Sequence, residues 1–230
     1  MFFAQMNENP VQRSLIATTS VALAEQFRDK EGKNILFFAD NMYRFIQARN
    51  ELATILDQTP NEGGYEPTIF SDIKVLQDRL SSNENGSITS VQTIYVPADD
   101  LSDPAVQMIQ HELDATMVLS RKVAEQGIRP AVDLSRTTSS LLTPEVVGDR
   151  HYVLSVQVQS LLQKYESLKG IIAIIGENEL SPADRADYAK AKKLIKNFTQ
   201  NMNVMTKHTG VEGEFYSREE TLRSIEEIIA

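Results

Sequence analysis

The amino-acid sequence predicts an α/β fold over residues 1–143 and an all-helical fold over residues 144–230. Strand-like and helix-like segments alternate in the first part, which is typical of a parallel sheet with helices on its faces. The uninterrupted apolar run Ile35-Leu36-Phe37-Phe38-Ala39 has the length of a strand buried on both faces. After Pro144 the strand signals stop and helical periodicity continues to the end.

The strands and helices of the first part follow from hydrophobic periodicity and from turn residues. Strands are expected at residues 1–6, 34–40, 90–96, 117–119 and 129–132. Helices are expected at residues 11–28, 41–56 and 69–80, the last after the turn Gly63-Gly64-Tyr65-Glu66-Pro67.

The second part contains three expected helices, at residues 145–168, 182–198 and 217–229. The middle helix has a clear start. Ser181 is a good N-cap, Pro182 suits the first turn, and Asp184 stands at the offset of a capping box.

Composition narrows the class of protein. A chain of 230 residues with 41% hydrophobic and 24% charged residues is an ordinary globular sequence of one or two compact units. Its net charge of −9, without a run of Lys or Arg, argues against a nucleic-acid surface. The absence of cysteine excludes thiolate zinc sites and disulfides. No stretch approaches the roughly 20 apolar residues that cross a bilayer, so we expect membrane association only through partner subunits.

The acid that ends the apolar run, Asp40, is the main candidate for chemistry. The carboxyl ends of parallel strands are where such sheets bind ligands, and in nucleoside triphosphatases an acid there helps to hold magnesium. The glycine-rich loop with Lys and Ser or Thr that grips the phosphates does not occur in the sequence. A structural alternative is that Asp40 interacts favourably with the dipole of the following helix.

Several segments together resemble one protein family. They are Gln5-Met6-Asn7-Glu8, Phe38-Ala39-Asp40-Asn41, Gly64-Tyr65-Glu66-Pro67-Thr68, Gly86-Ser87-Ile88-Thr89-Ser90-Val91-Gln92, Ile94-Tyr95-Val96-Pro97-Ala98-Asp99-Asp100-Leu101-Ser102-Asp103-Pro104, Leu113-Asp114-Ala115-Thr116 and Pro130-Ala131-Val132-Asp133. In this order they resemble the catalytic beta subunit of F-type ATP synthase, over nearly the whole chain.

The resemblance implies the carboxyl-terminal half of a RecA-like P-loop NTPase sheet followed by a helical domain. Residues 1–143 would be the part of the nucleotide-binding domain that carries the strand-end acid, and residues 144–230 the helical domain. Family members carry a beta-barrel, the phosphate-binding loop and a water-positioning glutamate ahead of the matched region. They also extend beyond the segment that matches Ala230. We therefore expect a fragment, or a split or truncated gene product.

The resemblance also implies catalytic residues and the cofactor, Mg²⁺ with ATP or ADP. Asp40 would support the magnesium through its water shell, and Arg44 would lie near the phosphates, one helical turn further on. Asn41 and Tyr95 would lie beside the nucleotide. An Asp40–Arg44 ion pair and a core position for Tyr95 are the structural alternatives.

The residues expected around adenine depart from the family pattern. Arg129 precedes Pro130 where the family has a stacking tyrosine, although a guanidinium can also stack on a base. Met202 and Asn197 stand where the family has aromatic rings, and Ser140 replaces an arginine. Losing a stacked ring costs about 1–3 kcal/mol by analogy with nucleic-acid bases, so we expect altered adenine affinity.

Two further segments resemble rotor contacts. The residues concerned are Asp100, Ser102 and Asp103 in the first segment, and Glu177, Glu179 and Asp184 in an acidic loop of the helical domain. The acidic loop carries fewer acids than the family pattern, which implies weaker coupling to a rotor.

The resulting hypothesis is a beta-like portion of a proton-translocating F-type ATPase. It would act in a hexameric ring with alpha-like and beta-like subunits around a central gamma-like rotor, on the cytoplasmic face of an energy-transducing membrane. Without a phosphate loop, the chain alone is expected to be inactive. The alternative is a non-catalytic, truncated paralogue that keeps the contact surfaces. A related helicase or secretion ATPase fits less well, because residues 96–104 resemble the synthase beta type.

Overall fold

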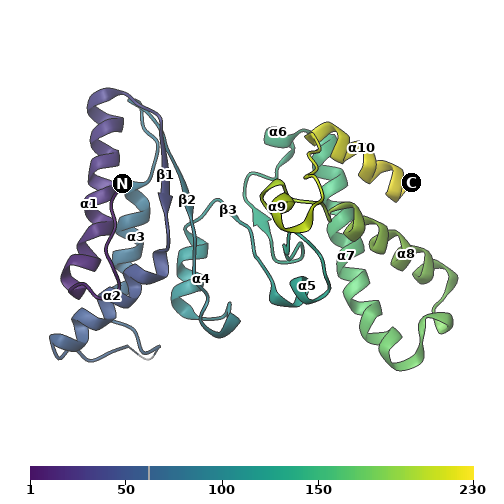
Figure 1. Ribbon diagram of the computed structural model, residues 1–230, viewed down its shortest axis with the longest axis horizontal. Helices are drawn as coiled ribbons and strands as arrows, with labels where there is room; N and C mark the ends of the chain where they lie inside the picture. The colour runs from purple at the N-terminus through teal and green to yellow at the C-terminus, as the bar shows by residue number, and fades with distance from the viewer. Residues whose placement is uncertain (62) are drawn as a thin grey trace. The chain divides into compact units, whose positions relative to one another are not determined.

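The computed structural model describes residues 1–61 and 63–230 and divides into two compact units, Met1–Leu113 and Asp114–Ala230 (Figure 1). We call them the first and the second unit. The domain boundary expected between residues 143 and 144 is a different division and stays a prediction.

A parallel two-stranded sheet forms the centre of the first unit. Strand β1 (Ile35–Ala39) pairs with β2 (Ile88–Gln92), with Ile35 opposite Ile88 and Ala39 opposite Gln92. The expected strand at residues 34–40 is therefore confirmed. The second strand was expected at residues 90–96, but it begins and ends earlier, so the segment after Gln92 lies beyond the sheet.

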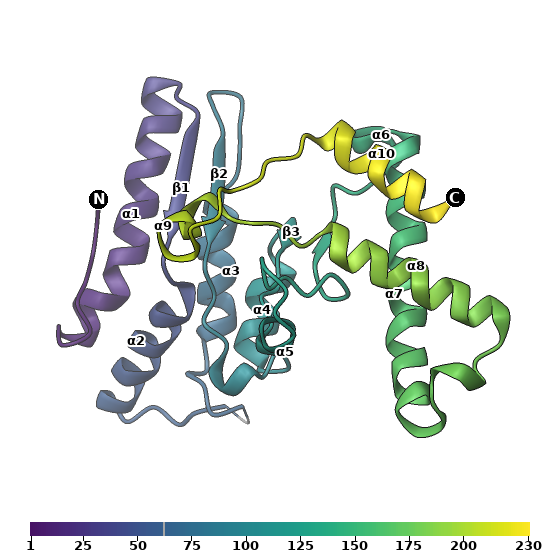
Figure 2. The same cartoon turned by 45° about the vertical axis from the view of Figure 1, so that its right-hand side comes forward.

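Four helices accompany this sheet in the first unit (Figures 1 and 2). They are α1 (Pro10–Glu31), α2 (Met42–Ile55), α3 (Ile69–Arg79) and α4 (Pro104–His111). The three helices expected from periodicity are present. Helix α4 was not expected, although Asp103 followed by Pro104 is a typical helix start.

The hydrophobic core of the first unit lies between these helices and one face of the sheet. Ile46, Ile69, Ile73 and Ile109 are fully buried, and Phe37 packs against them. Strand residues alternate between faces, so the neighbours of Phe37 point away from this core. Leu36 is 59% exposed and Phe38 is 69% exposed. The expectation that this strand is buried on both faces was therefore wrong, because within the described residues its second face has no covering layer.

The strand expected at residues 1–6 was wrong. The structure gives this segment no strand, and Phe3 and Met6 are 68% and 57% exposed. A strand needs a neighbour to satisfy its backbone groups, and no pairing to this segment occurs within the described ranges. Regular structure begins with α1, whose N-cap Asn9 accepts a hydrogen bond from Val11 N at 2.8 Å.

The second unit contains a small antiparallel pair, β3 (Ala115–Thr116) with β4 (Thr138–Ser139), and the short helix α5 (Arg121–Glu125). The expectation of strands at residues 117–119 and 129–132 was wrong, because neither segment forms a strand. In the part of the chain that the structure describes, Leu119 and Val132 alone pair between these segments, in an isolated antiparallel bridge. Pro130 donates no backbone hydrogen bond, which limits a ladder at this place.

Helices make up the rest of the second unit: α6 (Pro144–Val147), α7 (Asp149–Ile175), α8 (Pro182–Asn197), α9 (Thr206–Thr209) and α10 (Arg218–Ile229). The helix expected at residues 145–168 is interrupted at Gly148, which has a φ of 85°. Glycine adopts this backbone conformation readily, whereas it is strained for other residues. Leu154, Leu162, Leu194 and Ile225 pack in the core between α7, α8 and α10.

The expected cap of α8 is confirmed. Ser181 accepts a hydrogen bond from Asp184 N at 3.1 Å and donates its hydroxyl to the Asp184 carboxylate at 2.7 Å. Within the described part of the chain, no helix is both long enough and apolar enough to span a membrane.

The core of the first unit generates a stability prediction. Ile46→Ala removes a fully buried side chain of α2, and we expect it to lower the free energy of unfolding of the first unit by about 2–5 kcal/mol, because a cavity remains. Ile55→Ala, on the same helix but at a 66% exposed position, is the matched control. Urea unfolding followed at amide resonances of the first unit measures both, and equal losses would contradict this core assignment.

Candidate functional site

Asp40 lies at the carboxyl edge of the parallel sheet. It follows the last residue of β1 directly, and its side chain is exposed. Thr93, the residue after β2, lies beside it because Ala39 pairs with Gln92. The Thr93 hydroxyl donates a hydrogen bond to Asp40 Oδ1 at 2.7 Å. The acid is thus at the edge where parallel sheets bind ligands.

The start of α2 follows Asp40 immediately. Asn41 caps the helix, because its side-chain oxygen accepts a hydrogen bond from Arg44 N at 3.1 Å. The exposed Arg44 guanidinium donates to Gln47 Oε1 at 2.8 Å. Among the described residues no Asp40–Arg44 ion pair forms. A carboxylate, an arginine and a helix N-terminus are therefore gathered at one edge, where the helix N-terminus favours anions.

Tyr95 is not a core residue. It is 53% exposed and lies after the end of β2. Its ring centroid is 6.0 Å from that of Tyr43, which is buried in the first turn of α2. The Tyr43 hydroxyl lies 3.2 Å from the Tyr65 hydroxyl, which in turn donates to Asp103. Tyr95 thus contacts the buried Tyr43 near the sheet edge.

The acids of residues 97–103 differ in their surroundings. The Asp100 side chain is exposed and accepts hydrogen bonds from the hydroxyl and the backbone N–H of Ser102, which lower its pKa. Asp103 is the N-cap of α4. Its Oδ1 accepts from Ala105 N and Val106 N at 3.0 and 3.1 Å.

Asp103 also accepts a hydrogen bond from the buried hydroxyl of Tyr65. Burial raises the pKa of Tyr65, and the hydrogen bond to Asp103 adds to this effect. Both oxygens of Asp103 therefore have internal partners, whereas Asp100 faces solvent. Of the two acids, Asp100 is the better placed to meet a partner protein.

The expected adenine residues belong to the second unit. Arg129 donates through Nη1 to the carbonyls of Ala124 and Ile128, both at 2.9 Å, and so closes the end of α5. Its carbonyl accepts from Gln200 N at 2.9 Å, which ties the residue to the segment after α8.

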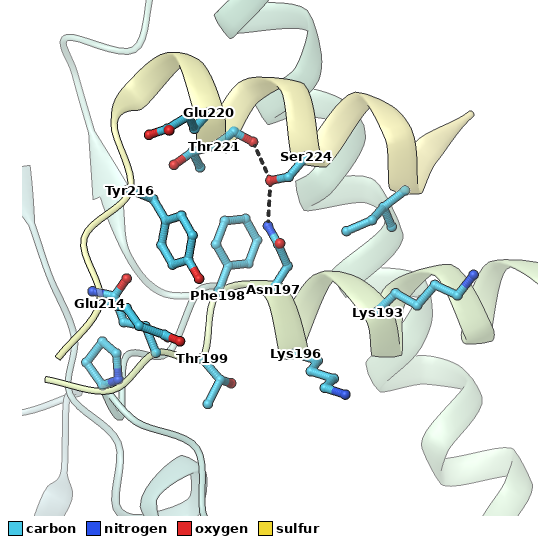
Figure 3. A pocket seen from close by; sticks show the side chains of 13 residues that line it. Lys193, Lys196, Asn197, Phe198, Thr199, Glu214, Tyr216, Glu220, Thr221 and Ser224 are labelled. Atoms are coloured by element: carbon cyan, nitrogen blue, oxygen red, sulfur yellow. Dashed lines mark hydrogen bonds between the residues drawn. The ribbon is translucent and has the colours of Figure 1, made fainter. Parts of the chain in front are cut away.

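A cavity of about 830 Å³ lies next to this segment, between the end of α8 and the start of α10 (Figure 3). Pro130, Phe198, Tyr216 and Ile228 contribute to its apolar lining. Asn197 also lines it and donates a hydrogen bond to Ser224 Oγ at 3.0 Å. Met202 is not among the lining residues. The structure thus brings Pro130 and Asn197 to one cavity and leaves Met202 outside it.

The acids expected in the acidic loop of the second unit differ in whether they form ion pairs within that unit. Asp184 forms an ion pair with Lys164 at 2.7 Å, and this contact together with Ser181 lowers the pKa of its carboxyl. Glu177 lies 3.4 Å from Lys192, and both side chains are half exposed. Glu179 is exposed. Asp184 therefore contributes to helix packing, while Glu177 and Glu179 remain at the surface.

The residues around Asp40 fit a magnesium ion bound together with a nucleotide. No group of three or more His, Asp or Glu side chains in the described part of the chain can hold a metal by itself. Magnesium needs only one or two carboxylates when phosphates and waters supply its other ligands. The second carboxylate oxygen of Asp40, Oδ2, has no hydrogen-bond partner among the described residues.

Sequence reasoning missed Thr93 and the pair Tyr43 and Tyr65. A usable signal existed for Thr93, because parallel strands that end together place the residues after them side by side. The tyrosine pair had no such signal, since it joins segments 22 residues apart through a turn.

Asp103 generates a prediction about the loop. Asp103→Ala removes both the cap of α4 and the acceptor of the Tyr65 hydroxyl, so we expect the first unit to lose about 1–3 kcal/mol of unfolding free energy. Asp100→Ala, an exposed neighbour, is expected to change it by less than about 0.5 kcal/mol. Residue-resolved urea unfolding measures both, and a larger effect at Asp100 would overturn this distinction.

The chain is similar in structure to three solved ATPase subunits. The first is NeqB, a unique ATP synthase subunit from Nanoarcheaum equitans, with a TM-score of 0.82 and 22% identity, over 98% of this chain and 55% of that one. The second is the assembled ATPase EscN of the enteropathogenic E. coli type III secretion system, with a TM-score of 0.80 and 27% identity, over 96% and 51%. The third is a prototypical type III secretion ATPase of pathogenic bacteria, with a TM-score of 0.76 and 27% identity, over 99% and 62%.

These likenesses confirm the expected fold class, a RecA-like ATPase sheet followed by a helical domain, and the chain spans between half and two thirds of each relative. The C-terminal domain of V and A type ATP synthase matches residues 141–215, so F-type beta is not singled out. The ATP synthase alpha/beta family, nucleotide-binding domain, matches residues 1–139. On that match, the chain belongs to the ATP synthase alpha/beta family.

Proposed function

We propose that the chain is a beta-like portion of an F-type rotary ATPase and supplies the magnesium side of a nucleotide site. The observation that carries this proposal is the exposed Asp40 at the carboxyl edge of β1, directly before the capped start of α2. The ligand is Mg-ATP or Mg-ADP, bound at interfaces with alpha-like subunits.

The chemistry of phosphoryl transfer supports this assignment of roles. Catalysis of this reaction consists mainly of positioning and of neutralising charge on the phosphates, a task that a bound magnesium shares. Asp40 would hold the water shell of a bound magnesium ion, and the exposed Arg44 guanidinium would supply a positive charge from the next turn of α2. Tyr95 and Asn41 shape the neighbouring surface.

The phosphate-binding loop has to come from outside these 230 residues, because the sequence contains no glycine-rich loop with Lys and Ser or Thr. The chain alone is therefore expected to bind nucleotide weakly and to hydrolyse none. The proposed assembly is a hexameric ring of alpha-like and beta-like subunits around a gamma-like rotor. It sits on the cytoplasmic face of an energy-transducing membrane, to which this chain attaches only through partners.

Residues 96–104 and the exposed Asp100 favour the synthase beta type over its relatives, because they resemble the loop that meets a rotor in that subunit. The acidic residues Glu177 and Glu179, at the surface of the second unit, form the second proposed rotor contact. Asp184 would contribute less, since Lys164 already pairs with it.

A second candidate is an ATPase of the secretion type. Two type III secretion ATPases match nearly the whole chain at 27% identity, and this observation favours that candidate. A non-catalytic paralogue is the third candidate, favoured by Arg129 and Met202, which stand where the beta subunit has aromatic rings. Purifying the native complex and identifying its other subunits separates the first two candidates. A gamma-like rotor and alpha-like subunits support the synthase type, and secretion components support the other.

Reconstitution tests whether the site is catalytic. We expect no ATP turnover from the 230-residue chain, and Mg²⁺-dependent turnover once it assembles with a polypeptide carrying the phosphate-loop half and with alpha-like subunits. Asp40→Asn is expected to lower that turnover by about 100-fold or more, as for removal of a group that stabilises transition-state charge. Turnover is measured by phosphate release.

Asp57→Asn is the matched control. Asp57 is exposed, follows α2, and has a φ of 54°, which asparagine accepts well. It should leave turnover unchanged. Hydrolysis by the isolated chain, or full activity of Asp40→Asn in the assembly, would refute the catalytic role.

A further inference from the structure

Thr93 continues the pairing of the two strands one residue beyond the sheet. Its N–H donates to the carbonyl of Ala39 at 2.9 Å, and its own carbonyl accepts from Met42 N at 3.0 Å. Met42 is the first residue of α2. The backbone of Thr93 is therefore fixed to both the end of β1 and the start of α2, on either side of Asp40.

The Thr93 side chain acts on the carboxylate itself. Its hydroxyl donates to Asp40 Oδ1 at 2.7 Å, a hydrogen bond to a charged acceptor. An exposed aspartate without such a bond samples several staggered side-chain conformations. With Oδ1 engaged, one conformation is favoured, and Oδ2 is left as the oxygen without a partner among the described residues.

We propose that Thr93 is a positioning residue that holds the Asp40 carboxylate with Oδ2 directed to the water shell of the magnesium ion. The inference rests on the proposed function for the metal, but the contact that carries it belongs to this chain alone. Thr93 is suited to the task because a β-branched side chain has few χ1 conformations and because its backbone is held on both sides.

The substitutions that test this role separate the hydroxyl from the shape of the side chain. Thr93→Val keeps the branched shape and removes the donor, whereas Thr93→Ser keeps the donor and removes the methyl group. Thr89→Val is the matched control. It makes the same change in β2, four residues earlier and on the same face of the strand, at an exposed position.

The first experiment uses the 230-residue chain alone. Three-bond couplings from Asp40 Cγ to its backbone nitrogen and carbonyl carbon report the χ1 conformation by NMR. We expect one dominant conformation in the parent, in Thr93→Ser and in Thr89→Val, and averaged couplings in Thr93→Val. If Thr93→Val perturbs amide resonances away from the sheet edge, Thr93→Ala replaces it.

Two results would overturn the inference at this stage. One is an unchanged Asp40 conformation in Thr93→Val, which would mean that the hydroxyl does not hold the carboxylate. The other is averaging in Thr93→Ser to the same extent as in Thr93→Val, which would assign the effect to the methyl group.

The second experiment measures ATP turnover in the assembled complex as a function of free Mg²⁺. In Thr93→Val the half-saturating Mg²⁺ concentration is expected to rise about threefold to tenfold, the effect of one hydrogen bond at an exposed site. Thr93→Ser and Thr89→Val should match the parent. Unchanged Mg²⁺ dependence in Thr93→Val, with Asp40→Asn impaired, contradicts the positioning role only. An unimpaired Asp40→Asn contradicts the proposed function instead.

Discussion

The parallel pairing of β1 with β2 is the constraint on which the first unit depends. It places Ala39 opposite Gln92, so the residues that follow the two strands, Asp40 and Thr93, meet at one edge. The same edge receives the start of α2, because Met42 N donates to the carbonyl of Thr93. A one-residue slip of either strand would turn its core face outward, and Asp40 would lose its partner.

The tyrosines connect this edge to the loop that we propose for rotor contact. Tyr43 belongs to α2, Tyr65 to the turn before α3, and Asp103 caps α4. Three elements of the first unit are thus fastened by hydroxyl groups inside an apolar core. Such contacts fix geometry because a buried hydroxyl without a partner is costly. The division between the internal Asp103 and the exposed Asp100 follows from this arrangement.

Much of the fold could be predicted from the sequence, for identifiable physical reasons. Helices α1, α2, α3, α8 and α10 were predicted from long segments with apolar residues at helical spacing, and β1 was predicted from the apolar run. Both patterns can be recognised within a short stretch of sequence. The failures concern elements whose partners are distant or absent. Residues 1–6 are as apolar as a strand but have no described neighbour to pair with. The two segments near Pro130 reduce to a single bridge, because short strands depend on their partners more than on propensity.

The site shows the same limit. Asp40 could be predicted, because an acid that directly follows a strand has a position fixed by the strand itself. Tyr43 and Tyr65 could not be assigned roles, since their contact joins segments separated in sequence. Thr93 was missed because the second strand was expected to end at residue 96 and not at Gln92. In the second unit, Arg129 stands where a stacking ring was expected, yet its guanidinium closes the end of α5. That contact arises from local backbone geometry, which a comparison of residue types does not reveal.

A structure of the native complex with bound Mg-ADP tests the central claim most directly. We expect the magnesium ion one water molecule away from Asp40 Oδ2, with the phosphates held by a glycine-rich loop from outside these 230 residues. Nucleotide bound with its metal at any other edge of the sheet, or a complete site that does not include Asp40, would contradict it.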